Sequence, residues 1–211
     1  MMKVDFEQLA KEMKTGDIIL FNGQYDGSKI IELFERSEWS HVGIVVKLDT
    51  YEGPLLWEAT SLTNIEDVVF HDNKTGVKLV DLRERLAHYG DELEKYETSN
   101  FSYRKMNVQR ENTLNEKVLE LNQHYHGIED PSFWTMVWDV VLGRIFRKSI
   151  PLDKFFCSEF VAQMYLELGF IDDRKPINAY MPSDFSDQGS KHLHLIKGVL
   201  EAEIFIDIKH I

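Results

Sequence analysis

Two stretches of the sequence decide the fold: SHVGIVV, residues 40–46, and LLWEAT, residues 55–60. Both have the length and the apolar composition of a buried β-strand. The linker between them contains aspartate, glycine and proline, which are typical turn residues. The two stretches therefore predict an antiparallel hairpin with a fairly long loop. Each contains one polar side chain that is unusual in a buried strand: a histidine in the first and a glutamate in the second.

The register of this hairpin decides whether the two polar side chains can meet. If Lys47 faces Pro54, then Gly43 faces Glu58, and the alternation of side chains along a strand places Glu58 and His41 on the same face. They are then diagonal neighbours, about 7–8 Å apart at their attachment points, a gap that the long glutamate can bridge. A shift of one residue would place them on opposite faces.

The rest of the chain alternates short strands with amphipathic helices. Further strands are predicted at residues 18–21, 77–80, 101–108 and 201–208. Helices are predicted at residues 3–14, 28–36, 113–124 and 131–146, and from Cys157 to just before Gly169. Because neither repeats nor low-complexity linkers interrupt the pattern, we expect a single α+β domain over residues 1–211, with a helical insert at about 109–156.

Composition narrows the function classes. The chain has 211 residues, of which 36 are acidic and 24 basic, and its formal net charge is −12. Such a charge repels a phosphate backbone, so nucleic acid is not an expected partner. Neither an export signal nor an apolar run long enough to span a membrane is recognisable, and the single cysteine fits a reducing compartment. The expected location is therefore cytoplasmic.

The single cysteine is placed where its chemistry could be used. The predicted helix starts at or just after Cys157, and its first-turn N–H groups stabilise a thiolate and can contribute to an oxyanion hole. A lone cysteine is more often an ordinary small buried residue. The histidine and the glutamate of the hairpin favour the chemical interpretation, because Cys157, His41 and Glu58 together make a nucleophile, a base and a group that orients the base.

Four segments, in this order, resemble one family: GDIILF at 16–21, SHVGIV at 40–45, WEAT at 57–60 and FCSEFV at 156–161. They are similar to the circularly permuted papain-like hydrolases of the NlpC superfamily, the YiiX-like group, in which the histidine precedes the cysteine. The segment PSDF at 182–185 resembles a family segment that borders the site.

The resemblance implies a papain-like α+β fold, with an antiparallel sheet packed against a cysteine-bearing helix. It also implies a cysteine peptidase or amidase in which Cys157 is the nucleophile, His41 the base and then the acid, and Glu58 the residue that holds the imidazole. The expected substrate is a small peptide or another compound containing amino acids, such as a cell-wall-derived peptide. Two alternatives stay open: a thiol acyltransferase or lipid amide or ester hydrolase on the same fold, and a binding module without catalysis.

Several further residues are candidates for weaker reasons. A substrate-binding role is assigned to the following polar and aromatic residues: Tyr25, Ser40, Ser158, Trp134, Trp138 and Arg104. Asp17 follows a glycine at a strand entrance, where a turn or capping role is expected. The pairs His124 and His126, and His192 and His194, lack a cysteine or helical histidine partner. We therefore predict exposed histidines, no metal site and no cofactor.

Overall fold

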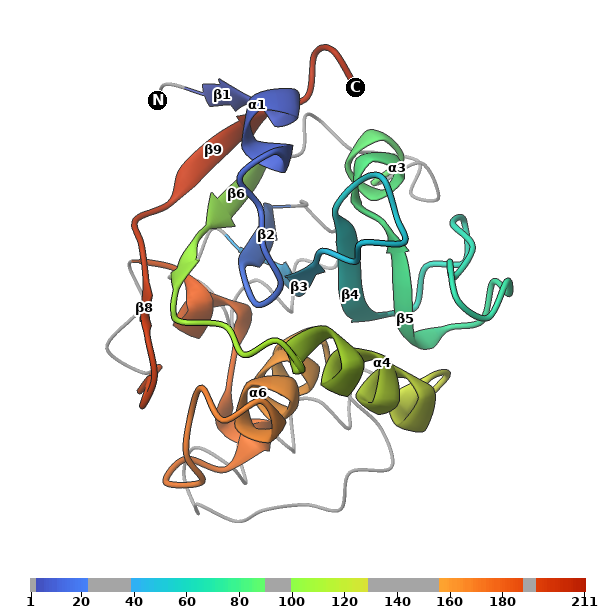
Figure 1. Ribbon diagram of the computed structural model, residues 1–211. Helices are drawn as coiled ribbons and strands as arrows, with labels where there is room; N and C mark the ends of the chain where they lie inside the picture. The colour runs from blue at the N-terminus through green and yellow to red at the C-terminus, as the bar shows by residue number, and fades with distance from the viewer. Residues whose placement is uncertain (1–2, 23–38, 90–99, 129–155, 188–192) are drawn as a thin grey trace, which may run out of the picture.

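The computed structural model describes residues 3–22, 39–89, 100–128, 156–187 and 193–211. Figure 1 shows a central sheet with helices on both sides. The strands are β1 (Lys3–Asp5), β2 (Ile18–Asn22), β3 (His41–Val46), β4 (Leu55–Thr60), β5 (Gly76–Asp81), β6 (Asn100–Arg104), β7 (Met106–Asn107), β8 (Val199–Leu200) and β9 (Ile204–Asp207). The helices are α1 (Phe6–Ala10), α3 (Leu82–Ala87), α4 (Leu114–Tyr125) and α6 (Cys157–Glu167), with 3-10 turns η1 (Ile177–Ala179) and η2 (Pro182–Phe185).

Seven of these strands form one sheet in the order β1-β9-β6-β2-β3-β4-β5, and β7 pairs with β8 in a second, two-stranded sheet. Neighbouring strands are antiparallel except β1 and β9, which run parallel. The expected α+β class is therefore confirmed, with a sheet that is mostly antiparallel. In β2, residues 18–21 are buried completely, as their continuous apolar run predicted.

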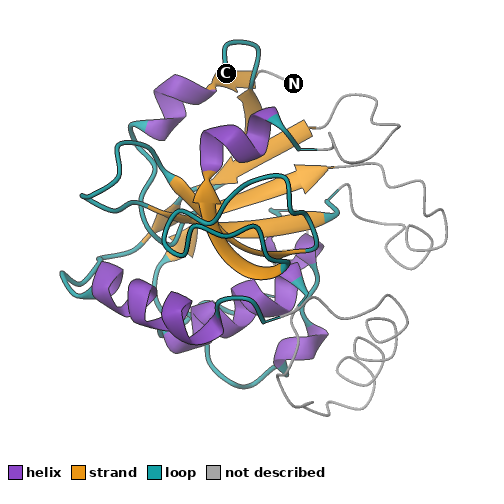
Figure 2. Cartoon of the chain, turned by 90° about the vertical axis from the view of Figure 1, so that its right-hand side faces the viewer, coloured by secondary structure: helices purple, strands orange, loops and turns teal. Residues whose placement is uncertain are grey.

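Two apolar cores lie on opposite faces of the sheet, because alternate strand residues point in opposite directions. One core packs against α4 and α6, and it includes Val42, Ile44 and Trp57. The other packs against α1 and α3, and it includes Val45 and Leu56. Figure 2 shows the resulting three layers, with helices above and below the strands. None of the helices among the described residues is long and apolar enough to cross a membrane.

The predicted hairpin forms with the predicted register. Ile44 pairs with Trp57 and Val46 pairs with Leu55, which by continuation sets Gly43 opposite Glu58. The strands predicted at residues 18–21 and 77–80 and the helix at 113–124 are also confirmed, within one or two residues at their ends. The cysteine-bearing helix begins at Cys157, and the chain leaves it through Gly169, whose φ is +72°.

The ends of other predicted elements were wrong. The helix expected over residues 3–14 is limited to α1, because residues 3–5 pair with β9 and the Asp5 side chain accepts a hydrogen bond from the amide of Glu7. The strand expected over 101–108 is interrupted after Arg104, and the amide of Met106 donates to the Asp17 carboxylate. The last strand covers 204–207 instead of 201–208. The helices predicted at 28–36 and 131–146 lie outside the described residues.

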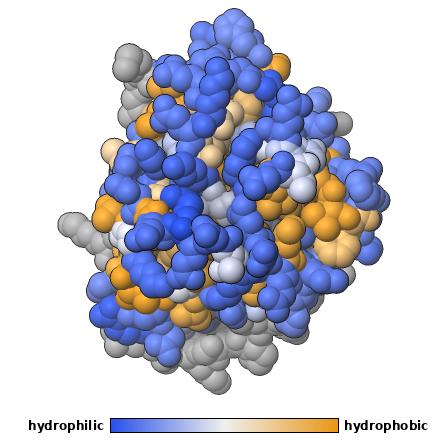
Figure 3. All heavy atoms as spheres, in the orientation of Figure 1, coloured by the Kyte–Doolittle hydropathy of each residue, from blue (hydrophilic) through white to orange (hydrophobic). Residues whose placement is uncertain are grey.

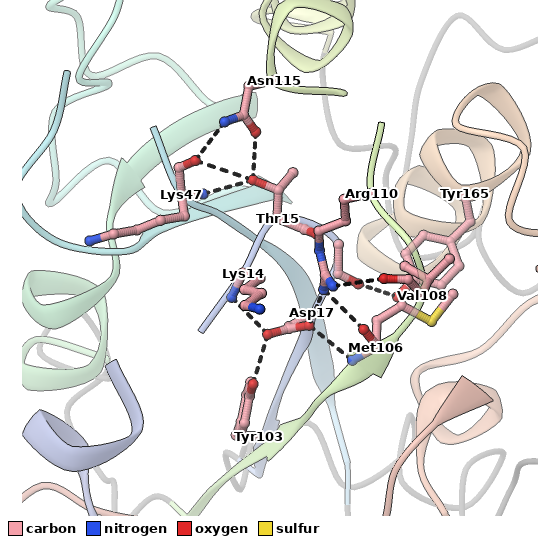
Figure 4. A network of polar contacts seen from close by, with 11 residues as sticks. Lys14, Thr15, Asp17, Lys47, Tyr103, Met106, Val108, Arg110, Asn115 and Tyr165 are labelled. Carbon is pink, nitrogen blue, oxygen red and sulfur yellow. Dashed lines mark hydrogen bonds and ion pairs between the residues drawn. The ribbon is translucent and has the colours of Figure 1, made fainter. Parts of the chain in front are cut away.

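Asp17 connects the entrance of β2 to the distant residues 103–110. Its buried carboxylate accepts hydrogen bonds from the Lys14 amide, the Tyr103 hydroxyl, the Met106 amide and Arg110 Nη2, at 2.7–2.9 Å (Figure 4). Burial raises the pKa of Asp17 although all four donors act to lower it. The expected turn role is therefore correct, and it is part of a larger structural network.

The face of the molecule in Figure 3 is mainly hydrophilic, in keeping with the high content of charged residues. Apolar groups interrupt it in places. Among the described residues, the large apolar side chains with the greatest exposure are Val69, Phe70, Leu119, Ile196 and Val199.

Candidate active site

His41 is the first residue of β3 and is paired with Phe21, the fourth residue of β2. Its side chain is 12% exposed, so it is mostly enclosed but reachable. The rings of Phe21 and Tyr89 flank the imidazole at centroid distances of 5.1 and 6.2 Å. These contacts limit the movement of the ring, and the polar partners described next determine its orientation.

Glu58 reaches His41 as the register predicted. The imidazole Nε2 lies 2.6 Å from Oε2 of Glu58, whose side chain is fully buried. Position 43 has to be small for this pairing, because a Cβ at Gly43 would lie 2.7 Å from Cδ1 of Leu56 and 3.2 Å from the carbonyl oxygen of Trp57. The glycine thus allows the close approach of the two strands that carry the histidine and the glutamate.

The other oxygen of Glu58 is held from α3. Arg85 Nε donates to Oε1 at 2.7 Å, and both side chains are fully buried. Arg85 Nη1 donates to Oδ1 of Asn64 at 2.9 Å. Burial raises the pKa of Glu58, but Arg85 and His41 outweigh burial and hold the pKa below its ordinary value. Glu58 is therefore an anion at neutral pH, in spite of its burial.

Cys157 lies at the N-terminus of α6, which packs on β3 and β4. Cys157 is a free cysteine, is partly exposed, and lies close enough to the His41 ring for its charge to act on the imidazole. Since Glu58 engages Nε2, Nδ1 is the ring nitrogen left for the sulfur. Burial lowers the pKa of His41, but the Cys157 charge and hydrogen bond, together with those of Glu58, raise it to about 10. The imidazole is therefore protonated at neutral pH.

The buried carboxylate of Glu58 contacts the His41 imidazole, and the sulfur of Cys157 acts on the same ring. A protonated imidazole beside a sulfur favours the thiolate, which is the nucleophilic form of cysteine. The first turn of a helix leaves N–H groups without intrahelical acceptors, and these can stabilise an anion near the sulfur. Cysteine, histidine and glutamate are residue types that can act as a nucleophile, a base and a group that orients the base.

Other predicted site residues have different surroundings. Ser40 is exposed, and its amide and hydroxyl donate to the carbonyl oxygen of Phe21. The buried Ser158 hydroxyl donates to the carbonyl oxygen of Tyr180, 3.0 Å away. Arg104 directs Nε, Nη1 and Nη2 to three backbone carbonyl oxygens, so these donors are used inside the protein. Tyr25, Trp134 and Trp138 lie outside the described residues.

The segment at 182–185 forms the 3-10 turn η2, which contacts β2 and β3. Asp184 in this turn accepts a hydrogen bond from the Met181 amide and pairs with Lys175 at 2.7 Å. The ammonium group of Lys175 also lies 4.0 Å from the centroid of the Tyr180 ring. Because the Tyr180 carbonyl is bound by Ser158, these contacts connect the turn to the first residues of α6.

The buried cations around Glu58 were not predicted. Arg85 belongs to the helix α3, which the sequence analysis did not identify. Lys78 lies opposite Glu58 in the pairing of β4 with β5, and its Nζ donates to the carbonyl oxygen of Ile65 at 2.8 Å. The signal that could have identified them is charge balance, since a buried glutamate in a strand needs a cationic partner as well as a histidine.

The histidine pairs do not form a metal centre among the residues that the structure describes, where no cluster of three or more potential ligands occurs. His126 is not exposed as predicted: its side chain is 9% exposed and stacks on Phe70 at a centroid distance of 3.8 Å. Its Nε2 lies 3.2 Å from Asp72. His124 and His194 are exposed, and His192 lies outside the described residues.

Comparison with known proteins gives a structural likeness to a solved protein. No family model matches the chain, and no curated protein matches it. Among solved structures, that of metalloprotein YiiX from Escherichia coli O157:H7 is similar, with a TM-score of 0.47 and 22% sequence identity. The match covers 74% of this chain and 66% of that chain, slightly less than two thirds of the YiiX structure.

Proposed function

We propose that the protein is a cysteine hydrolase that cleaves an amide bond through an acyl-enzyme. The observation that supports this function best is the contact of the His41 ring with both Glu58 and Cys157, at the N-terminus of α6. We further propose that the fold is a permuted papain-like one, as the order of these residues in the sequence implies. A cysteine-bearing helix on an antiparallel sheet is compatible with it.

The first half of the reaction transfers the acyl group to sulfur. The Cys157 thiolate attacks the carbonyl carbon, and the first-turn N–H groups of α6 stabilise the oxyanion. As the intermediate collapses, the carbon–nitrogen bond breaks and His41 donates its proton to the leaving amine. The sulfur charge is a principal cause of the raised pKa of His41, so loss of this charge makes the imidazolium a stronger acid when the leaving group needs a proton.

The second half of the reaction releases the acid. Neutral His41 takes a proton from water, the resulting hydroxide attacks the thioester, and the carbon–sulfur bond breaks to restore the thiolate and the imidazolium. Glu58 stays ionised throughout and holds Nε2, as a carboxylate fixed by Arg85 can do. Every step uses only substrate, water and these side chains.

We take the substrate to be a small peptide or another molecule with an amino-acid unit, such as a fragment of cell-wall peptide. The net charge of −12 favours a substrate that carries an amine. A reducing compartment such as the cytoplasm suits a lone thiol that has to remain unoxidised. An acyl chain from a lipid is the alternative acyl donor, and the experiment below distinguishes the two.

The test is to incubate the protein with sets of peptide amides and acyl lipids and to follow both product release and intact mass. Because the chain has one cysteine, a mass increase that hydroxylamine reverses identifies a thioester at Cys157. We expect turnover of peptide amides, and its loss in Cys157→Ala and His41→Ala. Activity that survives in Cys157→Ala would contradict the proposal. If acyl lipids alone form an adduct, and the acyl group then passes from Cys157 to an added amine, the result would instead indicate an acyltransferase.

A further inference from the structure

Arg85 binds the oxygen of Glu58 that does not contact His41. None of the interactions among the described residues joins Arg85 to the imidazole or to the thiol. Its Nε binds Oε1 of Glu58 while Oε2 binds His41, so the two carboxylate oxygens have separate partners. Asn64 holds the second arm of the guanidinium, and the Asn64 amide itself donates to the carbonyl oxygen of His88. The orientation of the guanidinium is therefore fixed on both sides.

Stability alone does not account for this buried pair. Replacing a buried ion pair by apolar residues is often neutral or stabilising, because desolvation offsets the attraction of the charges. Here the guanidinium atom Nη2 is buried without a hydrogen-bond partner among the described residues, which adds to that cost. Burying this ion pair therefore costs free energy. A role in the adjacent site explains the presence of the pair better than a contribution to stability does.

The charges around the site balance only when Arg85 is present. In the reactive state proposed above, the Cys157 thiolate and the Glu58 carboxylate are the anions, and His41 and Arg85 are the cations bound to Glu58. Without the guanidinium, His41 would be the one cation among the described residues that is hydrogen-bonded to Glu58. Glu58 would then be harder to keep ionised, since removing a neighbouring cation disfavours the carboxylate, and a neutral Glu58 would no longer support the imidazolium that stabilises the thiolate.

Lys78 is the other cation that faces Glu58, and it does not replace Arg85. It is opposite Glu58 on β5, but its Nζ donates to the carbonyl oxygens of Ile65 and Leu62. The pKa of Lys78 is lowered overall, because burial and the charge of Arg85 outweigh the opposite effects of Glu58, Asp67 and Asp72. Lys78 is therefore held by the loop at 62–65, and Arg85 is the cation bound directly to the carboxylate.

We propose that Arg85 is a positioning residue of the active site: it keeps Glu58 ionised and directed at His41, and so stabilises the thiolate–imidazolium pair. This inference rests on the proposed function, and it adds a fourth residue to the three that act in line. Arg85 acts through Glu58 and does not touch the reacting atoms.

The test measures the rate at which iodoacetamide alkylates Cys157 as a function of pH, because this rate follows the thiolate fraction and needs no substrate. In Arg85→Met we expect the acid limb of the profile to move up by about one pH unit, which makes alkylation about tenfold slower on that limb. Arg85→Lys retains the charge and should recover most of the rate. Arg110→Met removes a different arginine–carboxylate contact, with Asp17, and should leave the limb unchanged.

A double-mutant cycle tests whether Arg85 acts through Glu58. On a Glu58→Gln background, Arg85→Met should cause no further shift of the acid limb. The double variant removes both members of the buried ion pair, so neither charge of the pair is left without its partner. An acid limb that is the same in Arg85→Met and wild type would overturn the proposal, as would a full additional shift in the double variant. If wild-type Cys157 itself reacts like an ordinary thiol, both this proposal and the proposed function fail. If wild-type Cys157 shows the expected thiolate reactivity at neutral pH and Arg85→Met leaves the acid limb unchanged, only the proposed role of Arg85 fails.

Discussion

Nε2 of His41 and Oε2 of Glu58 lie 2.6 Å apart, on neighbouring strands whose register sets Gly43 opposite Glu58. The glutamate side chain is fully buried, and its charge is balanced from both ends by His41 and Arg85. This short contact determines which ring nitrogen remains for the sulfur, and it provides the first tests of the site.

Replacement of Glu58 by glutamine should lower the pKa of His41. Glutamine keeps the size of the side chain but loses the charge that favours the imidazolium, so we expect the titration midpoint, about 10 in the wild type, to fall by about one pH unit or more. NMR titration of the histidine rings measures it, with His41 assigned through its variant. The control is Glu66→Gln, which removes an exposed partner of His71. An unchanged midpoint in Glu58→Gln would show that Glu58 does not stabilise the imidazolium.

The same substitution should change the acid stability of the protein. The folded-state pKa of Glu58 is below its ordinary value of 4.5, so its stabilising contribution is present above that pH and disappears as the pH falls. We expect Glu58→Gln to reduce the free energy of unfolding by about 3 kcal/mol near pH 6. The difference from wild type should shrink below pH 4 in urea denaturation. If the difference is the same at both pH values, its cause is packing and not ionisation.

Gly43→Ala should destabilise the hairpin. The added methyl group would lie 2.7 Å from Cδ1 of buried Leu56, so we expect a loss of about 1–3 kcal/mol in the free energy of unfolding. Because the strands would be pushed apart, the alkylation rate of Cys157 should fall as well. Gly53→Ala is the matched control, since a Cβ there lies 3.7 Å from Asp81 Oδ2, an ordinary contact. Equal stabilities for the two variants would contradict this interpretation.

Asp17→Asn should affect stability and spare the site. The variant loses the charge that Arg110 pairs with and turns an amide group toward hydrogen-bond donors, so we expect a loss of about 3 kcal/mol. Asp17 precedes β2 at the end away from Phe21 and His41, so the alkylation profile of Cys157 should stay as in wild type. Asp49→Asn on an exposed loop should change stability by less than about 0.5 kcal/mol. A shifted profile in Asp17→Asn would connect this network to the site.

The hairpin was predictable because both of its strands are apolar runs and only one register brings the buried glutamate to a partner. The contact of His41 with Glu58 followed from that register. The role of Arg85 was not predictable from its neighbours in the sequence, since its partner lies 27 residues away and its helix has only six residues. Local patterns report which residues are apolar, but not which distant strand or helix supplies a buried charge.

The helix predicted at residues 3–14 has the expected apolar spacing, but its predicted bounds were wrong. Its apolar spacing is real, because Phe6, Leu9 and Met13 are all buried. Residues 3–5 nevertheless form a strand, because a partner strand from the far end of the chain offers hydrogen bonds that a local helix would otherwise supply. Long-range pairing overrides a local preference, and a single sequence gives no sign of it.

The position of β9 between β6 and β1 has a consequence for biosynthesis. Residues 3–5 are made about two hundred residues before the strand with which they pair. Until β9 has emerged, β6 has an open edge on that side, which is a site for wrong pairing with other chains. The strands β2 to β6 can therefore pair with one another before β9 is made, but this edge of β6 is closed only after β9 has emerged.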